Sequence, residues 1–245
     1  MKISILTLFP EMCNAFVNES IIGRAVKSDK VDIECINIRD FANNKHNKVD
    51  DTPYGGGMGM VMAAEPIYNA YKSVVGDKKP HLVYLSPKGA TFTQKKAIEL
   101  SNCEHLVLLC GHYEGIDERV IEEIVDEEIS IGDYVLTGGE LPALVVADAV
   151  CRMLPGVLSD DICFTEESHF SGLLEYPQYT KPAVWNGREV PEVLLSGHHA
   201  NIEKWRREKS IEITLDRRPD ILESAELSKK ELKYLESLKS AKHDI

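Results

Sequence analysis

The first 154 residues alternate between two hydrophobic periods. Short apolar runs typical of buried strands occupy residues 3–9, 81–85 and 106–110, and residues 31–38 alternate apolar and polar positions in the manner of a strand. Apolar positions at helical spacing occupy residues 10–26, 66–75, 93–102, 116–128 and 140–154. Residues 129–136 are typical of a strand or an extended loop. Strands that alternate with helices over short connections predict an α/β domain with a largely parallel sheet.

The pattern changes after Pro155 and Gly156. Residues 158–170 have weak periodicity and several acids, which is typical of a linker between domains. Further on, residues 200–213 and 228–240 predict helices, the second with Ser228 as its cap and Glu231 at the capping-box spacing. We therefore expect an α/β domain over residues 1–157, a linker over 158–172 and a small all-helical domain over 173–245.

Composition adds limits on the environment. Apolar residues make up 43% and charged residues 28% of the chain, as in ordinary globular proteins. No run approaches the roughly 20 apolar residues of a membrane helix, and we expect no signal peptide and no membrane partner. The six cysteines are dispersed without a C-x-x-C pair, which favours buried thiols in a reducing cytoplasm over disulfides or a zinc site.

A net charge of −12 argues at first against a nucleic-acid partner. The acidic excess, however, lies within the first 185 residues, and residues 186–245 carry as many basic as acidic side chains. A basic cluster in residues 197–218 contains His198, His199, Lys204, Arg206, Arg207, Lys209, Arg217 and Arg218. Such a cluster suits phosphate binding, although a solvated helix face explains it equally well.

Three glycine-bearing segments follow predicted strands or loops, at residues 54–60 (YGGGMGM), 110–115 (CGHYEG) and 131–140 (IGDYVLTGGE). Ligands of open α/β sheets bind beyond the carboxyl ends of the strands, where glycine lets a backbone approach closely. YGGGMGM lacks the lysine and hydroxyl of a P-loop and the spacing of a dinucleotide loop, so we reject a phosphate loop there. A flexible tight turn is its simplest interpretation.

Candidate chemical groups each have a structural alternative. Glu114 follows a strand, where a carboxylate can hold a base edge or a magnesium ion, or can simply begin a helix. Arg152 ends an apolar helix, where it either meets an anion or complements the helix dipole. Residues 165–168 (TEES) either keep the linker solvated or supply a mobile general base.

Seven stretches, in order from residue 3 to about 210, carry a resemblance to a known family. They are ISILTLFPEM, DDTPYGGGMGMVM, YLSPKG, LLCGHYEGIDERV, EISIGDYVLTGGELPALVVADAVCRMLPGVL, SGLLEYPQYTKP and VPEVLLSGHHANIEKWRREKS. Together they resemble the bacterial tRNA (guanine-N1)-methyltransferases of the SPOUT class, the TrmD family. The resemblance implies a parallel-sheet domain with a deep trefoil knot and a helical C-terminal domain. It also implies a homodimer with its active site between subunits, S-adenosylmethionine bent inside the knot, tRNA guanine 37 as substrate, and support from Mg²⁺.

The resemblance also implies site residues. The methyl-donor pocket would be lined by Tyr84, Leu85, Ser86, Pro87, Gly111, Ile131, Gly132, Asp133, Tyr134, Val135, Leu136, Gly138, Gly139 and Pro142. Glu114 and Arg152 would meet the guanine and its magnesium environment, although the ligands of the metal stay unknown. The residues expected to contact tRNA are His198, His199, Trp205, Arg206 and Arg207.

The reaction requires a base, because guanine N1 carries a proton at neutral pH. The family usually has an aspartate before the serine of its Asp-Ser-Phe stretch, whereas this chain has Glu167 before Ser168. Our hypothesis is that Glu167 is the base, one methylene longer than the aspartate it replaces. A second departure is Lys181 where arginine is common, which keeps the charge but loses bidentate geometry.

Three other functions compete with this interpretation. The altered base position is compatible with an RNA-binding module that has lost catalysis. The basic C-terminal helices are compatible with a DNA-binding pair, although we expect no DNA partner. The nearest enzymatic rival is another SPOUT methyltransferase, acting elsewhere on tRNA or on rRNA.

Overall fold

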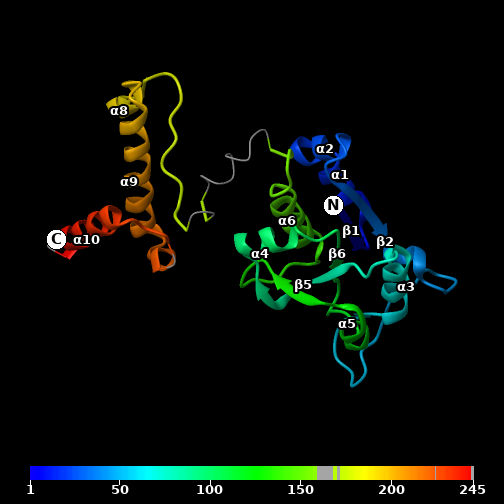
Figure 1. Cartoon of the computed structure of the whole chain (residues 1–245). Coiled ribbons are helices and arrows are strands. Elements are labelled where there is room, and N and C mark those ends of the chain that lie inside the picture. The colour runs from blue at the N-terminus through cyan, green and yellow to red at the C-terminus, as the bar shows by residue number, and fades with distance from the viewer. Residues whose placement is uncertain (159–167, 170–171, 224, 244–245) are drawn as a thin grey trace. The chain divides into compact units, whose positions relative to one another are not determined.

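The computed structural model describes residues 1–158, 168–169, 172–223 and 225–243 (Figure 1). The chain divides into two compact units, Met1–Asp161 and Ile162–Ile245. The division falls inside the segment expected to be a linker. Each unit is described by itself.

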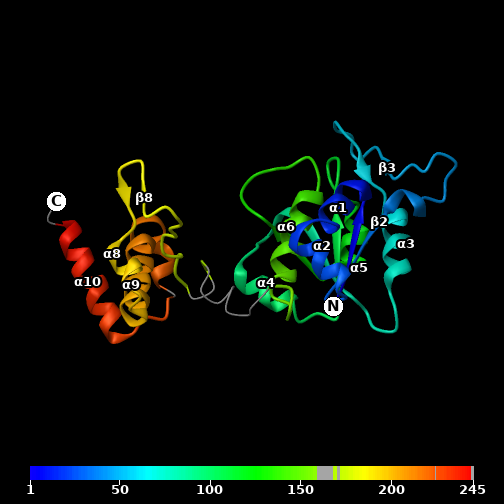
Figure 2. The same cartoon turned by 90° about the horizontal axis from the view of Figure 1, so that it is seen from above.

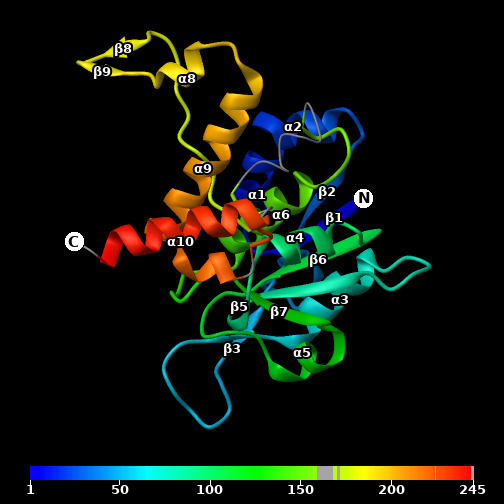
Figure 3. The ribbon, with the colours of Figure 1, turned by 60° about the vertical axis from the view of Figure 1, so that its left-hand side comes forward.

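The first unit is built on a five-stranded parallel sheet in the order β2-β1-β6-β5-β7. Its strands are β1 (Lys2–Thr7), β2 (Asp32–Asn37), β5 (His81–Thr91), β6 (His105–Cys110) and β7 (Glu127–Ser130). The predicted α/β class with a parallel sheet is confirmed. A separate pair, β3 (Asp50–Asp51) and β4 (Val61–Met62), is antiparallel, and its loop projects away from the sheet (Figures 2 and 3).

Helices cover both faces of this sheet. In β6, Leu106 and Leu108 pack on one face, and Val107 and Leu109 pack on the other, as the two-residue period of a strand requires. The first face is covered by α1 (Pro10–Val17), α2 (Ser20–Lys27), α4 (Gln94–Leu100) and α6 (Glu140–Cys151). The second is covered by η1 (Ile38–Phe41), α3 (Ala64–Val74) and α5 (Glu118–Ile124). A sheet covered on both faces explains the nearly continuous apolar runs of its strands.

Two predicted helices differ from those observed. The single helix expected over residues 10–26 is two helices, because Ser20 has a φ of 54° in the left-handed region, where a helix cannot continue. In the first of them, Cys13 and Val17 are buried, and Met12 is 43% exposed. The helix expected to reach residue 128 ends at Ile124, and the acids after it begin the edge strand β7.

Strand β5 is longer than its apolar run, and it is interrupted. Its pairing with β7 shifts between Leu85 and Ala90, so residues 86–89 leave the regular ladder. Pro87 in this excursion has no N–H to donate to a neighbouring strand. Gly89 passes so close to β7 that a Cβ would lie 2.4 Å from the carbonyl carbon of Glu128. Residues 86–89 therefore form a short loop within β5, and the strand pairs with β7 again from Ala90.

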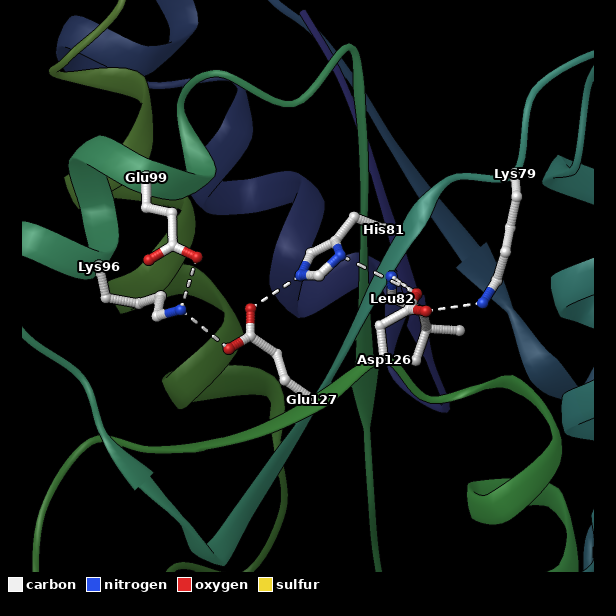
Figure 4. A network of polar contacts seen from close by, with 7 residues as sticks. All are labelled: Lys79, His81, Leu82, Lys96, Glu99, Asp126 and Glu127. Carbon is white, nitrogen blue, oxygen red and sulfur yellow. Dashed lines mark hydrogen bonds and ion pairs between the residues drawn. The ribbon is translucent and has the colours of Figure 1, made fainter.

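Polar contacts tie the start of β5 to the start of β7 (Figure 4). Asp126 accepts a hydrogen bond from the Leu82 N–H at 2.8 Å and pairs with Lys79 Nζ at 2.6 Å. Burial alone would raise the pKa of Asp126, but these two donors outweigh it, and the pKa is lowered. The ionised form of Asp126 therefore stabilises this edge of the sheet.

Glu127 extends the same network to helix α4. One carboxylate oxygen lies 2.7 Å from His81 Nε2, and the other lies 3.1 Å from Lys96 Nζ (Figure 4). Lys96 also reaches Glu99 at 2.9 Å, and the pKa of Lys96 is raised by its hydrogen bond to Glu99. The network joins β5, β7 and α4, which are distant in sequence, at the edge where the sheet ends.

The second unit is mainly helical. It contains α8 (Glu192–Leu195), α9 (His199–Arg217), η2 (Pro219–Glu223) and α10 (Lys229–His243). Its small core consists of Leu173, Ile211 and Leu235. The predicted capping box is confirmed: Ser228 N–H donates to Glu231 Oε2 at 2.6 Å, and Glu231 N–H reaches Ser228 Oγ at 3.4 Å.

The expectation of an all-helical second domain is wrong in one respect. Strands β8 (Val184–Trp185) and β9 (Arg188–Glu189) form a short antiparallel hairpin near α8 (Figure 3). Asn186 and Gly187 make its turn, with φ values of 50° and 73°. Both residues adopt positive φ in a type I′ turn, for which Asn-Gly is the preferred pair.

The sequence predicts buried thiols without disulfides and no membrane-spanning helix. The described cysteines Cys13, Cys35, Cys103, Cys110 and Cys151 are free thiols. Among the described residues, no helix is both long and apolar enough to cross a bilayer. Cys163 lies outside the described residues.

We predict that Asp126→Asn lowers the free energy of unfolding at pH 7 by about 1 kcal/mol, the scale of one lost hydrogen bond. Because the pKa of Asp126 is lowered in the folded protein, this contribution is present above about pH 4 and is lost as the pH falls through the folded-state value. Urea unfolding of both proteins from pH 7 to pH 3 measures this, and the two stabilities should converge at the acid end.

Asp77→Asn is the matched control. Asp77 is exposed and makes no ion pair with the residues that the structure describes, so its variant should follow the parent protein within about 0.5 kcal/mol at every pH. An equal gap between the parent and Asp126→Asn at pH 7 and pH 3 would contradict the assignment.

Candidate functional site

A pocket of about 460 Å³ lies beyond the carboxyl ends of β5, β6 and β7. Its walls are formed by residues 84–88, 111–116, 129–132 and 134–139, together with Glu118 and Ile121 of α5 and Pro142 of α6. Because these strands are parallel, their ends meet at one edge of the sheet, where ligands of open α/β proteins bind.

The structure brings together most of the expected donor-binding residues. The pocket is lined by Tyr84, Leu85, Ser86, Pro87, Gly111, Ile131, Gly132, Tyr134, Val135, Leu136, Gly138, Gly139 and Pro142. Asp133 is exposed in the same loop and is not among the described lining residues. His112, Tyr113 and Glu114 also line the pocket.

Tyr84 supplies a phenol to the wall of the pocket. It is 5% exposed, and burial, together with the charges of Glu128 and Glu118, raises its pKa to about 12. The phenol therefore keeps its proton and acts as a hydrogen-bond donor. Its ring lies so close to Gly111 that a Cβ there would be 2.9 Å from the Tyr84 hydroxyl.

Glycines let residues 138–139 pass directly beside the end of β6. Gly139 N–H donates to Gly111 O at 2.9 Å, and a Cβ on Gly139 would lie 2.7 Å from Cys110 Cα. A Cβ on Gly138 would lie 2.1 Å from His112 Nε2. At Gly139 a Cβ would meet backbone atoms, so the packing requires glycine there. At Gly138 a Cβ would meet the side chains of His112 and Glu140.

Glu114 is held against the glycine cluster of residues 54–60. Its N–H donates to Met60 O at 3.0 Å, and a Cβ on Gly59 would lie 2.5 Å from its Oε1. Gly55, Gly56 and Gly57 have positive φ and open space around them. The cluster therefore combines the flexible turn expected from its composition with one close contact, at Gly59.

A buried carboxylate behind the pocket was not identified from the sequence. Glu140, the first residue of α6, is 3% exposed and lies 2.7 Å from both Thr7 Oγ1 and His112 Nε2. The sequence shows Glu140 only as an acid in the first turn of an otherwise apolar helix. An acid at that position is explained by the helix dipole alone, so the sequence does not indicate that Glu140 is buried.

Arg152 lies at the opposite end of α6 from the pocket. It is the C-cap of the helix, about 15 Å from Pro142 at 1.5 Å per residue. Burial raises the pKa of Asp148, one turn earlier, and the charge of Arg152 opposes that rise. Arg152 is not among the described residues that line the pocket, so a single chain does not bring it to Glu114.

The remaining catalytic candidate, Glu167, lies outside the described residues, as does Glu166. The adjacent Ser168 is described, and its Oγ accepts a hydrogen bond from the Glu175 N–H at 3.0 Å. Among the described residues, no group of three or more His, Cys, Asp or Glu side chains is arranged to hold a metal ion.

The residues expected to contact tRNA lie on α9 or at its start. His198 and His199 are exposed. The ring of Trp205 lies 6.4 Å from that of Tyr179, and the guanidinium of Arg206 lies 4.8 Å from the ring centre of Tyr176. These contacts join Trp205 and Arg206 of α9 to Tyr179 and Tyr176, which precede the helix in the chain.

Arg207 forms hydrogen bonds within the second unit. Its Nε donates to Glu231 at 2.5 Å, and its Nη2 donates to Glu226 O at 3.0 Å. Glu231 is also the capping-box residue of α10. Arg207 thus fastens α9 to the start of α10, whatever else it contacts.

Comparison with known proteins gives one consistent result. The family model described as tRNA (Guanine-1)-methyltransferase TrmD matches residues 1–224. A tRNA (guanine-N(1)-)-methyltransferase of Ruminiclostridium cellulolyticum is 62% identical over 90% of this chain and 96% of its own. Enzymes of the same name from Alkaliphilus oremlandii and Bacillus cereus are 56% and 51% identical over 99% of this chain and all of theirs. The chain therefore belongs to the tRNA (guanine-N1)-methyltransferase family.

Proposed function

We propose that this chain methylates N1 of the guanine at tRNA position 37, next to the anticodon, with S-adenosylmethionine as methyl donor. The observation that carries the proposal is the pocket at the ends of β5, β6 and β7, in a chain that matches the family model over residues 1–224. Its volume of about 460 Å³ lies within the range of small-molecule sites. We place the reaction in the cytoplasm, where the free thiols of the described cysteines persist.

The pocket fits the donor in its chemistry. Gly111, Gly138 and Gly139 line the pocket and have no side chains that would keep an adenosine away from their backbone. Ile131, Val135 and Leu136 can contact its ring, and the Tyr84 phenol can donate a hydrogen bond. The donor, when bound, supplies an electrophilic methyl group on a sulfonium.

Methylation requires that the protein removes the N1 proton of the guanine and stabilises the negative charge that develops on O6. The N1–H proton would pass to a carboxylate, which we assign to Glu167. The N1 lone pair would then form the new bond to the methyl carbon while the bond from that carbon to the sulfonium sulfur breaks, which leaves a neutral thioether. Negative charge that spreads to O6 requires a preorganised cation, which we assign to Arg152. Glu114, which lines the pocket, suits a base edge or a magnesium ion that keeps several of its waters.

We further propose that the active enzyme is a homodimer. Arg152 lies about 15 Å along α6 from the pocket of its own chain, so a second copy is needed to bring it to the guanine. Apolar side chains lie exposed beside this region: Leu141 and Val145 on α6, and Phe9 and Met12 at α1 are 43–51% exposed. Such a face is typical of an interface.

The family's trefoil knot belongs to the same proposal. Residues 131–139 return to residues 111–115 through the Gly139–Gly111 hydrogen bond and the bridge between His112 and Gly138. This close return is compatible with a knotted donor site. The proposed division of labour assigns the donor and catalytic groups to residues 1–157, the base to the linker 158–172, and tRNA contacts to residues 173–245.

Transfer of tritiated methyl groups to tRNA transcripts tests the proposal. We expect incorporation from S-adenosylmethionine into a transcript with guanine at position 37 and at least about 100-fold less with adenine there, because adenine N1 has no proton to remove and no O6. Equal labelling of both transcripts would point to another nucleotide and would reject position 37.

Replacement of the linker acids tests the base. We expect Glu167→Gln to lower the single-turnover rate by about 10²–10⁴, the range for a general base, with little change in donor affinity. Glu166→Gln is the matched control and should keep a near-normal rate. A near-normal rate for Glu167→Gln would move the role to another group.

Gly139→Ala tests the donor pocket. A Cβ at this position meets the backbone of Cys110 and Gly111, which a change of rotamer cannot relieve. We expect the affinity for S-adenosylmethionine, measured by calorimetry, to fall by about tenfold or more, or about 1.4 kcal/mol. Gly76→Ala is the control, because Gly76 is exposed with open space around its Cβ position; equal affinities of the two variants would contradict this pocket.

A further inference from the structure

The Glu140 carboxylate is buried behind the pocket and does not reach into it. It is 3% exposed and is absent from the described residues that line the pocket. A buried carboxylate needs hydrogen-bond donors, and Glu140 has two, the Thr7 hydroxyl and His112 Nε2, each at 2.7 Å. Its place at the start of α6 adds the favourable end of a helix dipole. The carboxylate is thus fixed from three sides.

His112 connects Glu140 to the wall of the pocket. Its side chain is 16% exposed and lines the pocket, and its N–H lies 3.2 Å from Met62 Sδ. Its ring centre lies 5.0 Å from that of Phe9, and the missing Cβ of Gly138 leaves the space that the ring occupies. The ring is therefore enclosed on several sides, and Glu140 determines its rotation.

The hydrogen bond also selects which ring nitrogen carries a proton. We assign the proton of this hydrogen bond to His112 Nε2, with the Glu140 oxygen as the acceptor. Thr7 Oγ1 accepts from the Phe9 N–H at 2.9 Å, and its own proton points to Glu140. The Thr7 hydroxyl and His112 Nε2 thus both donate to Glu140, one to each carboxylate oxygen. These two hydrogen bonds fix the orientation of the carboxylate.

His112 in turn sets the position of the loop that carries Glu114. The loop is held by the bridge between His112 and Gly138 and by the hydrogen bond from Glu114 N–H to Met60 O at 3.0 Å. Within this loop, Tyr113 has a φ of 60° and Gly115 a φ of 131°. Because Glu114 lies two residues after His112 in the loop, we expect a shift of the His112 ring to displace the Glu114 carboxylate.

We propose that Glu140 is a positioning residue for methyl transfer: acting through His112, it fixes the loop that presents Glu114 to the guanine. The inference rests on the proposed function. Glu140 is not a catalytic residue in this scheme, because it touches neither ligand. Misplacement of reacting groups by about 1 Å can lower a rate by about 10².

Glu140→Gln is the direct test, because it keeps the shape and removes the charge. Glutamine cannot accept from both Thr7 and His112 through its single oxygen. We expect the single-turnover rate to fall by about 10–100-fold, the affinity for S-adenosylmethionine to stay within about threefold, and the ¹⁵N spectrum of His112 to show the proton moved from Nε2. A rate within threefold of the parent would overturn the proposal.

Asp126→Asn is the matched control for loss of stability. It also replaces a hydrogen-bonded carboxylate by an amide, at the far edge of the β5–β7 pair, and it should lower stability while leaving the single-turnover rate unchanged. If the rate of Glu140→Gln falls only in proportion to the folded fraction, as measured by thermal unfolding, the effect is structural and the proposal is rejected.

A pair of substitutions at His112 gives an independent answer if Glu140→Gln does not fold. Glutamine at 112 can still donate an N–H to Glu140 but cannot exchange a proton near neutral pH, whereas alanine can do neither. Positioning predicts that His112→Gln keeps at least about ten times the rate of His112→Ala; equal loss in both would reject it. Failure of the parent protein to methylate guanine 37 would instead reject the proposed function.

Discussion

The site depends on one close approach between two backbones, where residues 138–139 pass the end of β6. The hydrogen bond from Gly139 N–H to Gly111 O spans 2.9 Å, and no Cβ fits between the two segments. This contact fixes the start of α6 against the central strand, so Glu140 reaches Thr7 and His112. The wall formed by residues 134–139 and the buried Glu140 carboxylate both lie next to this contact.

The edge of the sheet contributes the second wall of the pocket. Strand β5 leaves its ladder at residues 86–89 and rejoins it at Ala90, which makes a loop without ending the strand. Residues on both sides of this loop pair with β7, and the ion pairs of Asp126 and Glu127 lie where β7 starts. These charges lie outside the pocket and contribute to the stability of the sheet edge.

Local features of the fold could be predicted from the sequence, because they depend on neighbours in the chain. The apolar runs of β1 and β6 and the capping box at Ser228 and Glu231 are of this kind. The extension of β5 past Pro87 could not be predicted, because it depends on pairing with β7. The hairpin at Asn186 and Gly187 did carry a local signal, but its two-residue strands are too short to show a period.

The candidate site divides in the same way. The glycine-bearing loops indicated a ligand beyond the strands, and the resemblance identified the residues that the structure gathers into one pocket. The role of Glu140 could not be predicted, because its partner Thr7 is 133 positions away. The separation of Arg152 from the pocket follows from the length of α6, and a sequence cannot say which end of a helix meets a ligand.

That separation has a consequence for how activity depends on the amount of protein. If Arg152 acts on the guanine bound to another copy, each folded chain contributes its pocket to one active site and its Arg152 to a second active site. Dilution below the dissociation constant of the dimer would then abolish turnover while every domain stays folded and the donor pocket stays intact. Catalytic competence would be a property of the chain's concentration as well as of its sequence.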